Sequence, residues 1–512
     1  MTYIHLWNHR WIYVVCFFFH HVSFNLTTGE VYMSRITLEE FVEENELKEI
    51  NDLPEEELAE QEQVAQSETL EAGSETEELI ANQERSIDTV EALEALREAM
   101  ESKGQLSETD LKLMRIATEM AVAGTGFTIT SVVPSLESND PKLALEGFSD
   151  RIKSIVVKIG ENISRIFQAI KNFFATIVLS FRSMAGRTKK LLAKAKAIQA
   201  SGKTKADDIT IKYRDIFIVG DGNRIKDLSQ FTSEYKTTMS AIDKTISTIT
   251  VNAKYNAQEY GVLATIKDLA KIEETGKKFY TYVDDLMHGV VKDMKMKKVS
   301  SIRNCDVYVA KDNLGGYGFE IRIPGSGHYD RNNYKDLKKS LPLFKFYTDS
   351  RISDQERNSI DTSPMTIKTV SIKSIIGLLE DTLSNLSIEI KHLDKLTELY
   401  NAASYRAEGA IRTTINIFSA AVGFGAAHTF NKLAAAHSVK VVMGGEEVGK
   451  IAGGVALGTS ALLDYTLFSF RAMSKNNSLI YDSVNNCFHL FNIVTKDTIW
   501  SVNEILNKGR WQ

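Results

Sequence analysis

The chain has 512 residues, of which 43% are hydrophobic and 25% charged, and its formal net charge is −6. This length allows two or three domains with a sizeable core, so a disulfide-stapled miniprotein is excluded. The three cysteines (Cys16, Cys305 and Cys487) and ten scattered histidines lack metal-ligand spacing, and we expect a reducing compartment, no metal site and no cofactor.

The small net charge conceals two opposed regions. Residues 33–146 hold 29 Asp and Glu against 8 Lys and Arg, whereas residues 147–512 hold 37 against 52. Such asymmetry between segments predicts an acidic N-terminal segment joined to a basic body. The sign changes at the bond between Glu146 and Gly147.

Residues 1–32 differ from the rest and contain two of the four tryptophans. The apolar run from Trp11 to Phe19 is too short to span a bilayer, and no small-residue signal cleavage site follows it. One interpretation is a short apolar leader. The other, which we favour, is an upstream extension that is not normally translated. In that case a ribosome-binding sequence encoding residues 28–32 precedes a start at Met33.

The acidic segment, residues 33–146, is rich in Glu, Gln, Ser and Ala. We expect it to be largely disordered, because residues 54–79 in particular offer too little apolar surface to offset chain entropy. Two short helices are expected further on, at 86–104 and 107–126, each with a capping Ser or Asp at its start. The segment is either a solubilising tail or a removable part that masks the basic body.

A small residue, any residue and Glu, followed by another small residue, recur four times in the acidic segment. The copies at 69–71 and 92–94 carry little weight in such Glu-rich sequence. The other two flank a proline-containing stretch where a protease could reach extended backbone. The candidate cleavage residues are Ser135, Leu136 and Glu137, and Ala144, Leu145, Glu146 and Gly147, with the Glu146–Gly147 bond at the charge boundary.

A long basic helix is predicted to follow. From Phe148 to Phe181 apolar residues recur at spacings of three and four, which indicates an amphipathic helix. Residues 147–200 carry 11 basic and 2 acidic side chains. This suits a core helix with a solvated face, and equally a surface for polyphosphate or an anionic membrane. The candidate nucleic-acid-binding residues are Arg151, Lys153, Lys158, Arg165, Lys171, Arg182, Arg187, Lys189, Lys190, Lys194 and Lys196.

Two β insertions are predicted, near 209–222 and 304–325. Residues 209–219 form a strand pattern that ends at a Gly-Asp-Gly turn. Val307 and Val309, then Phe319, Ile321 and Ile323, alternate around the Gly315–Gly316 turn of a hairpin. Neither glycine cluster has the strand-to-helix context of a phosphate loop. The polar residues Asp312, His328 and Asp330 lie in loops, and we expect no catalytic site.

The remaining patterns are helical, over about 229–299 with a break near 254–261, over 366–405, and over 483–509. Residues 413–430 and 451–470 are almost uncharged and rich in glycine. They suit packed membrane helices or a tightly packed hairpin, and Asp464 favours the hairpin. The predicted fold class is mainly α, with long amphipathic helices in a bundle and a small β-hairpin or sheet element, preceded by a disordered acidic N-terminal segment.

An acidic leader, a small-x-Glu tripeptide, Gly147–Phe148 and a Lys-rich amphipathic helix form a layout that resembles the phiKZ-like bacteriophage internal head proteins. The resemblance covers a body of roughly residues 147–512. It implies a structural virion protein without enzymatic activity, made in the host cytoplasm as a precursor and held inside the phage head. The implied partners are the phage prohead protease, which cuts after Ser/Ala-x-Glu, other head or scaffold proteins, and packaged double-stranded DNA.

The charge pattern agrees with that resemblance. A basic body binds DNA without sequence preference through its phosphates, and a linked acidic segment opposes this binding. Two alternatives stay open. The first is a packaged effector enzyme that is ejected into the host, with a site around 304–330. The second is a membrane-active or membrane-anchored protein that uses 411–470 and the helix at 148–181.

Overall fold

The structure is a computed structural model. It describes residues 23–24, 31–32, 55–101, 107–122, 148–219, 223–225, 227–263, 269–310, 314–325, 327–330, 334–350, 362–422, 442–443, 446–447 and 454–512. The chain divides into two units, Met1–Leu58 and Ala59–Gln512. In the first unit, β1 (Ser23–Phe24) pairs antiparallel with β2 (Val31–Tyr32). The expectations for the rest of residues 1–32 lie outside the described residues.

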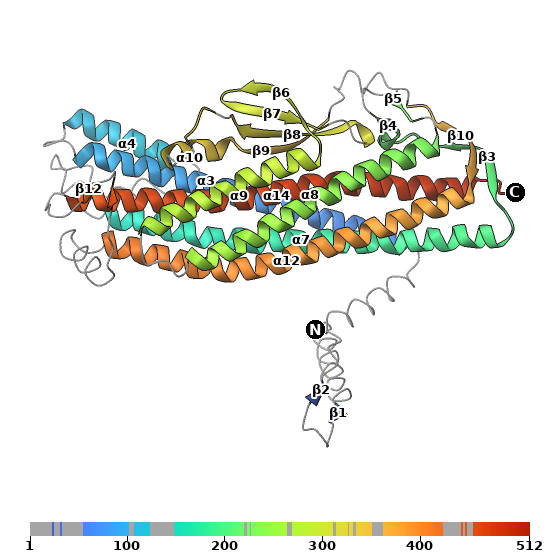
Figure 1. Ribbon diagram of the computed structural model, residues 1–512, viewed down its shortest axis with the longest axis horizontal. Coiled ribbons are helices and arrows are strands. Elements are labelled where there is room, and N and C mark those ends of the chain that lie inside the picture. Colours follow the sequence, from blue (N-terminus) through green and yellow to red (C-terminus); the bar gives the residue numbers. More distant parts are fainter. Residues whose placement is uncertain are drawn as a thin grey trace. The chain divides into compact units, whose positions relative to one another are not determined.

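A bundle of long helices forms the second unit (Figure 1). Helix α12 packs along α7 and α8, while α14 packs against α7, α8, α9 and α12. The predicted class, mainly α with a small antiparallel sheet element, is confirmed. The bundle helices are α7 (Phe148–Ala200), α8 (Leu228–Leu263), α9 (Leu269–Asp293), α12 (Ile372–Val422) and α14 (Gly454–Lys508).

The apolar stripe predicted on α7 is the centre of the core. Every predicted stripe position from Ile155 to Phe181 is buried. Phe167 and Phe174 both contact Tyr400 of α12, with ring centroids 5.6 and 5.4 Å apart, and Phe181 contacts Phe491 of α14 at 4.8 Å. Burying one such aromatic ring contributes roughly 1.5–3 kcal/mol, so this stripe fixes how α12 and α14 pack on α7.

Helix α14 is covered on nearly all sides from Thr466 to Val494. Its interior face mixes aromatic residues with polar ones such as Ser474, Asn476 and Ser483. Cys487 of α14 and Cys305 are free buried thiols. This burial on most sides agrees with the packing of α14 against four other bundle helices.

A four-stranded antiparallel sheet in the order β6-β7-β8-β9 lies on one side of the bundle (Figure 1). The predicted hairpin is confirmed as β7 and β8, with Val309 opposite Glu320. Gly315 lies in the connection with a φ of 80°, a conformation that favours glycine. The strands are β6 (Lys297–Ile302), β7 (Cys305–Val309), β8 (Tyr317–Pro324) and β9 (Lys345–Ser350), with η2 (Leu314–Gly316), α10 (Tyr334–Ser340) and η3 (Leu341–Leu343) between them.

Strand β3 (Lys205–Ile211) pairs antiparallel with β10 (Met365–Ser371). The predicted helix at 366–405 is therefore wrong in its first turn and a half. Residues 366–370 are Thr, Ile, Lys, Thr and Val, and such β-branched residues favour a strand. Ile367 and Val370 are buried in this two-stranded ribbon. The short pieces η1 (Asp215–Phe217), β4 (Ile218–Val219) and β5 (Asn223–Arg224) follow β3, and β11 (Val442–Met443) pairs with β12 (Glu446–Glu447).

The expectation of disorder is wrong for residues 55–79, which form one continuous helix, α3 (Glu55–Glu101), together with most of the short helix predicted at 86–104. Its buried residues include Ala65, Thr76, Gln83, Val90 and Leu93. Several buried positions are seven residues apart, as in a helix packed lengthwise on others. Before Ile87 this stripe is mostly small or polar, so a hydrophobicity pattern misses that part, and the apolar surface that receives it belongs to the body.

Helix α4 (Glu108–Val122) confirms the second short helix expected in the acidic segment. Ser107 caps its start, accepting from the backbone N–H of Asp110 at 3.2 Å, while Asp110 accepts from the Ser107 backbone N–H at 3.0 Å. This is the reciprocal arrangement of a capping box.

Candidate polyanion-binding surfaces

The basic residues predicted on α7 do not share one surface. Lys158 and Arg165 are exposed on one face of the first half of the helix, while Lys171 and Arg182 are half-buried. The side chains of Arg151 and Lys153 lie outside the described residues. A helix as long as α7 rotates its basic positions past several neighbours, so 11 cations in sequence do not make 11 cations on one face.

The last four predicted residues lie together with further cations at the end of the bundle that holds the C-terminus (Figure 1). These four are Lys189, Lys190, Lys194 and Lys196. Backbone hydrogen bonds tie this end together. The Thr204 N–H donates to the Gln512 carbonyl at 2.6 Å, and the Ile372 N–H donates to the Thr204 carbonyl at 3.0 Å. We call it the cationic end: Lys189, Lys190, Lys194, Lys196, Lys203, Lys205, Lys212, Lys368, Lys373, Lys508 and Arg510.

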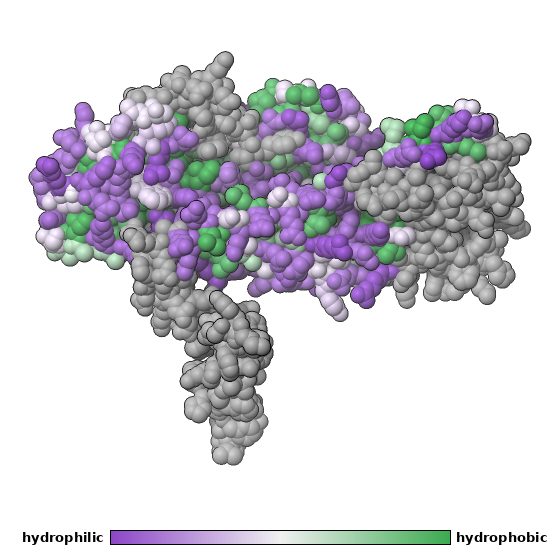
Figure 2. Space-filling view, turned by 180° about the vertical axis from the view of Figure 1, so that it is seen from behind, coloured by the Kyte–Doolittle hydropathy of each residue, from purple (hydrophilic) through white to green (hydrophobic). Residues whose placement is uncertain are grey.

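Most of the cationic end faces solvent, and its cations outnumber the carboxylates beside them, which include Asp207 and Asp208 of β3. Lys196 pairs with Glu380 at 2.9 Å at the surface, and the exposed Lys508 pairs with the half-buried Glu504 at 2.6 Å. An exposed pair such as the first stabilises by only about 0–1 kcal/mol and exchanges readily for other anions. Seen from behind, the surface toward this end is mostly hydrophilic (Figure 2). The cationic end therefore presents an open, positively charged surface drawn from α7, β3, β10, α12 and α14.

Sequence reasoning missed seven members of the cationic end, because they come from segments far apart in the chain. Lys203 and Lys205 follow α7, Lys368 and Lys373 lie about 170 residues later, and Lys508 and Arg510 close the chain. No local pattern marks them. Only the β3–β10 pairing and the return of the C-terminus bring them together.

A second set of cations lies under α3, and we call it the cation row: Arg187, Lys338, Arg471, Lys475 and Lys496. Arg187 of α7 forms an ion pair with Glu62 in which the two side chains are only 5% and 2% exposed. Arg187 is thus one predicted DNA-binding residue that is not at the surface of the full-length chain. Its guanidinium also lies 5.2 Å from the centre of the Trp500 ring.

The other members of the cation row also meet polar groups of α3. Arg471 contacts Asp88 at 2.5 Å and Glu91 at 3.2 Å, and Lys338 contacts Glu91 at 2.9 Å. Lys475 lies 3.7 Å from Glu84, and Lys496 donates to the Gln66 side-chain oxygen at 3.0 Å.

Burial and neighbouring carboxylates shift the pKa values of Arg471 and Lys475 in opposite directions. Desolvation disfavours the charge of Arg471, but Glu91 and Asp88 outweigh it and raise the pKa of the guanidinium. Desolvation dominates at Lys475, whose pKa is lowered although Glu84 opposes the shift. The positive charges of the row therefore depend on nearby anions.

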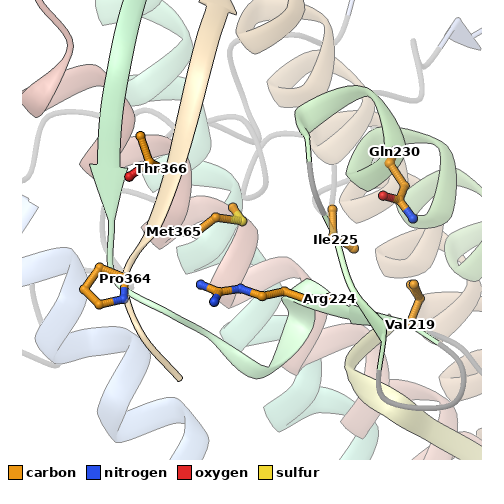
Figure 3. Close-up of a pocket in the computed structure, with 7 residues that line it drawn as sticks. All are labelled: Val219, Arg224, Ile225, Gln230, Pro364, Met365 and Thr366. Carbon is orange, nitrogen blue, oxygen red and sulfur yellow. The ribbon is translucent and has the colours of Figure 1, made fainter. Parts of the chain in front are cut away.

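A cavity of about 700 Å³ opens between the β4–β5 hairpin and β10 (Figure 3). Among its described lining residues the one cation is Arg224, which donates to the Ser363 carbonyl at 2.5 Å and to the Ser363 hydroxyl at 3.3 Å. Because this guanidinium is already engaged, the described lining does not form a prepared anion site. It is lined by Val219, Arg224, Ile225, Gln230, Pro364, Met365 and Thr366.

Other kinds of site find no support in the described part of the chain. It contains no group of three His, Cys, Asp or Glu side chains placed to hold a metal ion. None of its helices combines the length and apolarity needed to cross a bilayer. The predicted cleavage residues 135–137 and 144–147 lie outside the described residues. The copies at 69–71 and 92–94 lie within α3, where Leu93 and Glu94 are buried.

The fold and its surfaces define a class: a helical-bundle protein whose candidate chemistry is the binding of polyanions. The family model of the phiKZ-like phage internal head proteins matches residues 43–386. The chain therefore belongs to that family, as its layout led us to expect. No curated protein and no solved structure matches it.

Membership in this family gives the chain a structural role in the interior of a phage head and places it in the virion. The matched region includes α3 and α4 as well as the first part of the basic body. It ends within α12, so α14 and three members of the cation row lie beyond it.

Proposed function

We propose that this internal head protein is made in the host cytoplasm as a precursor, is cut by the phage prohead protease after Glu146, and binds packaged double-stranded DNA without sequence preference. It works alongside other head and scaffold proteins and performs no catalysis. Cutting at Glu146 separates 29 acidic residues from the basic body, which leaves that body with a strong positive charge.

The cationic end is the observation that carries the DNA-binding part of this proposal. Its lysines come from five elements, lie at the surface, and meet few carboxylates. Exposed lysines neutralise phosphates and release counterions, a mode of binding that needs no base contact. This mode of binding suits packaged DNA, whose phosphates are the same whatever the base sequence.

The structure favours the tripeptides at 135–137 and 144–146 as cleavage sites over those at 69–71 and 92–94. A protease needs an exposed backbone that can become extended. The tripeptides at 69–71 and 92–94 are helical, and the second has a buried Leu and Glu. Cleavage there requires α3 to unfold, so we place processing after Glu137 or Glu146 and favour Glu146.

Mass spectrometry of trypsin-digested purified virions tests the processing step. We expect a peptide that begins at Gly147 without trypsin having produced that end, and depletion of peptides from residues 33–146. A peptide that begins at Ser138 instead assigns the cut to Glu137. Intact Leu143–Arg151 in amounts equal to peptides of the body contradicts processing at Glu146.

A further inference from the structure

The carboxylates of α3 lie over the cation row in chain order. Glu62 meets Arg187, Glu84 meets Lys475, and Glu91 meets Arg471 and Lys338. Contacts move toward the start of α14 as the α3 residue number rises, so the two helices run antiparallel. From Glu62 to Glu91 an α-helix rises about 44 Å, which sets the length of the row. Over that length, duplex DNA carries about 26 phosphate charges.

Helix α3 buries more polar side chains than the core helix α12 does. Along α12 the buried positions include Ile375, Leu379, Leu386 and Leu393, whereas α3 buries Glu62, Thr76, Gln83 and Thr89. Both side-chain polar atoms of Gln83 are buried with no hydrogen-bond partner among the described residues. An unsatisfied buried amide costs about 1–3 kcal/mol. The contact of α3 with the body is therefore partly polar and imperfectly matched at Gln83, although α14 also buries unsatisfied polar atoms.

The second half of α3 nevertheless anchors it. Ile87, Val90 and Leu93 belong to the same hydrophobic cluster as α7 and α14. The Tyr481 hydroxyl donates to the Gly73 carbonyl at 2.9 Å, and a Cβ at Gly73 would lie 3.3 Å from that hydroxyl oxygen. These contacts hold α3 in place after the chain is cut. Release therefore needs a competitor for the cations, not the cut alone.

We propose that the cation row is a second DNA-phosphate site, which α3 occupies in the precursor with carboxylates where phosphates later bind. This inference rests on the proposed function, because it takes DNA as the competitor. It adds that DNA and α3 exclude one another at a specific set of cations, the cation row. Charge masking by the acidic segment as a whole requires no such exclusion.

A matched pair of full-length variants distinguishes exclusion at the cation row from general charge masking by the acidic segment. Glu84→Gln, Asp88→Asn and Glu91→Gln together remove three carboxylates that face the row. Glu71→Gln, Glu75→Gln and Glu78→Gln together remove the same charge from exposed positions of the same helix. We expect the first triple to bind a 30-bp duplex at least about fivefold more tightly than the second at low salt. Equal affinity of the two triples overturns the inference and leaves general masking in place.

A second measurement uses the folded full chain with a specific protease site inserted between residues 123 and 147. After the cut, we expect the N-terminal fragment to stay bound on size exclusion and to leave when duplex DNA is added. A complex that keeps DNA and both fragments together overturns the inference. Equal release by poly-glutamate at matched charge overturns the assignment to phosphate. If the cut chain binds no DNA at low salt, the proposed function fails as well.

Discussion

Glu62 and Arg187 form a buried ion pair although 125 residues separate them in the chain. The pair joins the acidic segment to the basic body, and both of its side chains are buried. We predict that Glu62→Gln destabilises the full-length protein by about 3–5 kcal/mol, because it leaves a buried guanidinium without its anion. Chemical denaturation followed by circular dichroism measures the loss.

Two controls belong with this prediction. Glu71→Gln on the exposed side of the same helix should change the free energy of unfolding by less than about 0.5 kcal/mol. The double variant Glu62→Leu with Arg187→Met should recover most of the loss, since an apolar pair replaces a buried ion pair at little cost. A single Glu62→Gln variant as stable as the parent shows that α3 is not docked.

The long apolar stripe of α7 was readable from the sequence because its spacing needs no knowledge of the partner helices. The same reasoning failed for the first part of α3, whose buried residues before Ile87 are mostly small or polar and give a weak hydrophobic signal. It also failed at 366–371, where a strand of β-branched residues joins α12 without a break. In both places the deciding partner lies more than 100 residues away, on α7 and α14 or on β3.

The candidate site was predictable only in part for the same reason. The basic run at 189–196 is local, and the structure places it at the cationic end. The cations that complete this end arrive through strand pairing and the C-terminus, while Arg187, just before the run, turns inward to Glu62. A sequence gives the number of charges on a helix, but its neighbours decide which of them meet solvent.

The cationic end should carry most of the salt dependence of DNA binding. We predict that Lys189→Gln, Lys203→Gln and Lys373→Gln together lower the slope of log affinity against log salt concentration by about 2–3, since each phosphate contact contributes about 0.9. Fluorescence anisotropy with a labelled duplex at several salt concentrations measures the slope. The equally exposed lysines 254, 292 and 297, changed to Gln together, serve as the control. Identical slopes for the two triples refute the assignment.

Glu389 of α12 gives the fold a pH dependence. Burial, with the nearby charge of Asp243, raises the pKa of Glu389 to about 8. The folded state therefore holds a proton that the unfolded chain releases near pH 4.5. Its stabilising effect is complete below that pH and is lost as the pH rises through about 8. We predict a loss on the order of 3 kcal/mol between pH 5 and pH 9, measured by urea denaturation.

Glu389→Gln should remove most of this dependence, because the amide stays neutral at every pH. Glu398→Gln, at an exposed position of the same helix, should leave it unchanged. If the parent and Glu389→Gln lose stability equally between pH 5 and pH 9, the ionisation of another group is responsible.

Gly276 sets how closely α9 approaches α14. A Cβ at this position would lie 2.6 Å from the Phe468 ring, whose side chain is fully buried. We predict that Gly276→Ala destabilises the protein by about 1–3 kcal/mol, because either the ring or the helix must shift. Gly377→Ala in α12 is the matched control, since no atom lies within 4 Å of its added Cβ. There the loss of backbone freedom in the unfolded chain should stabilise by about 0.5–1 kcal/mol. Thermal unfolding of both variants must therefore shift in opposite directions, and a shift of both in the same direction contradicts this packing of α9 on α14.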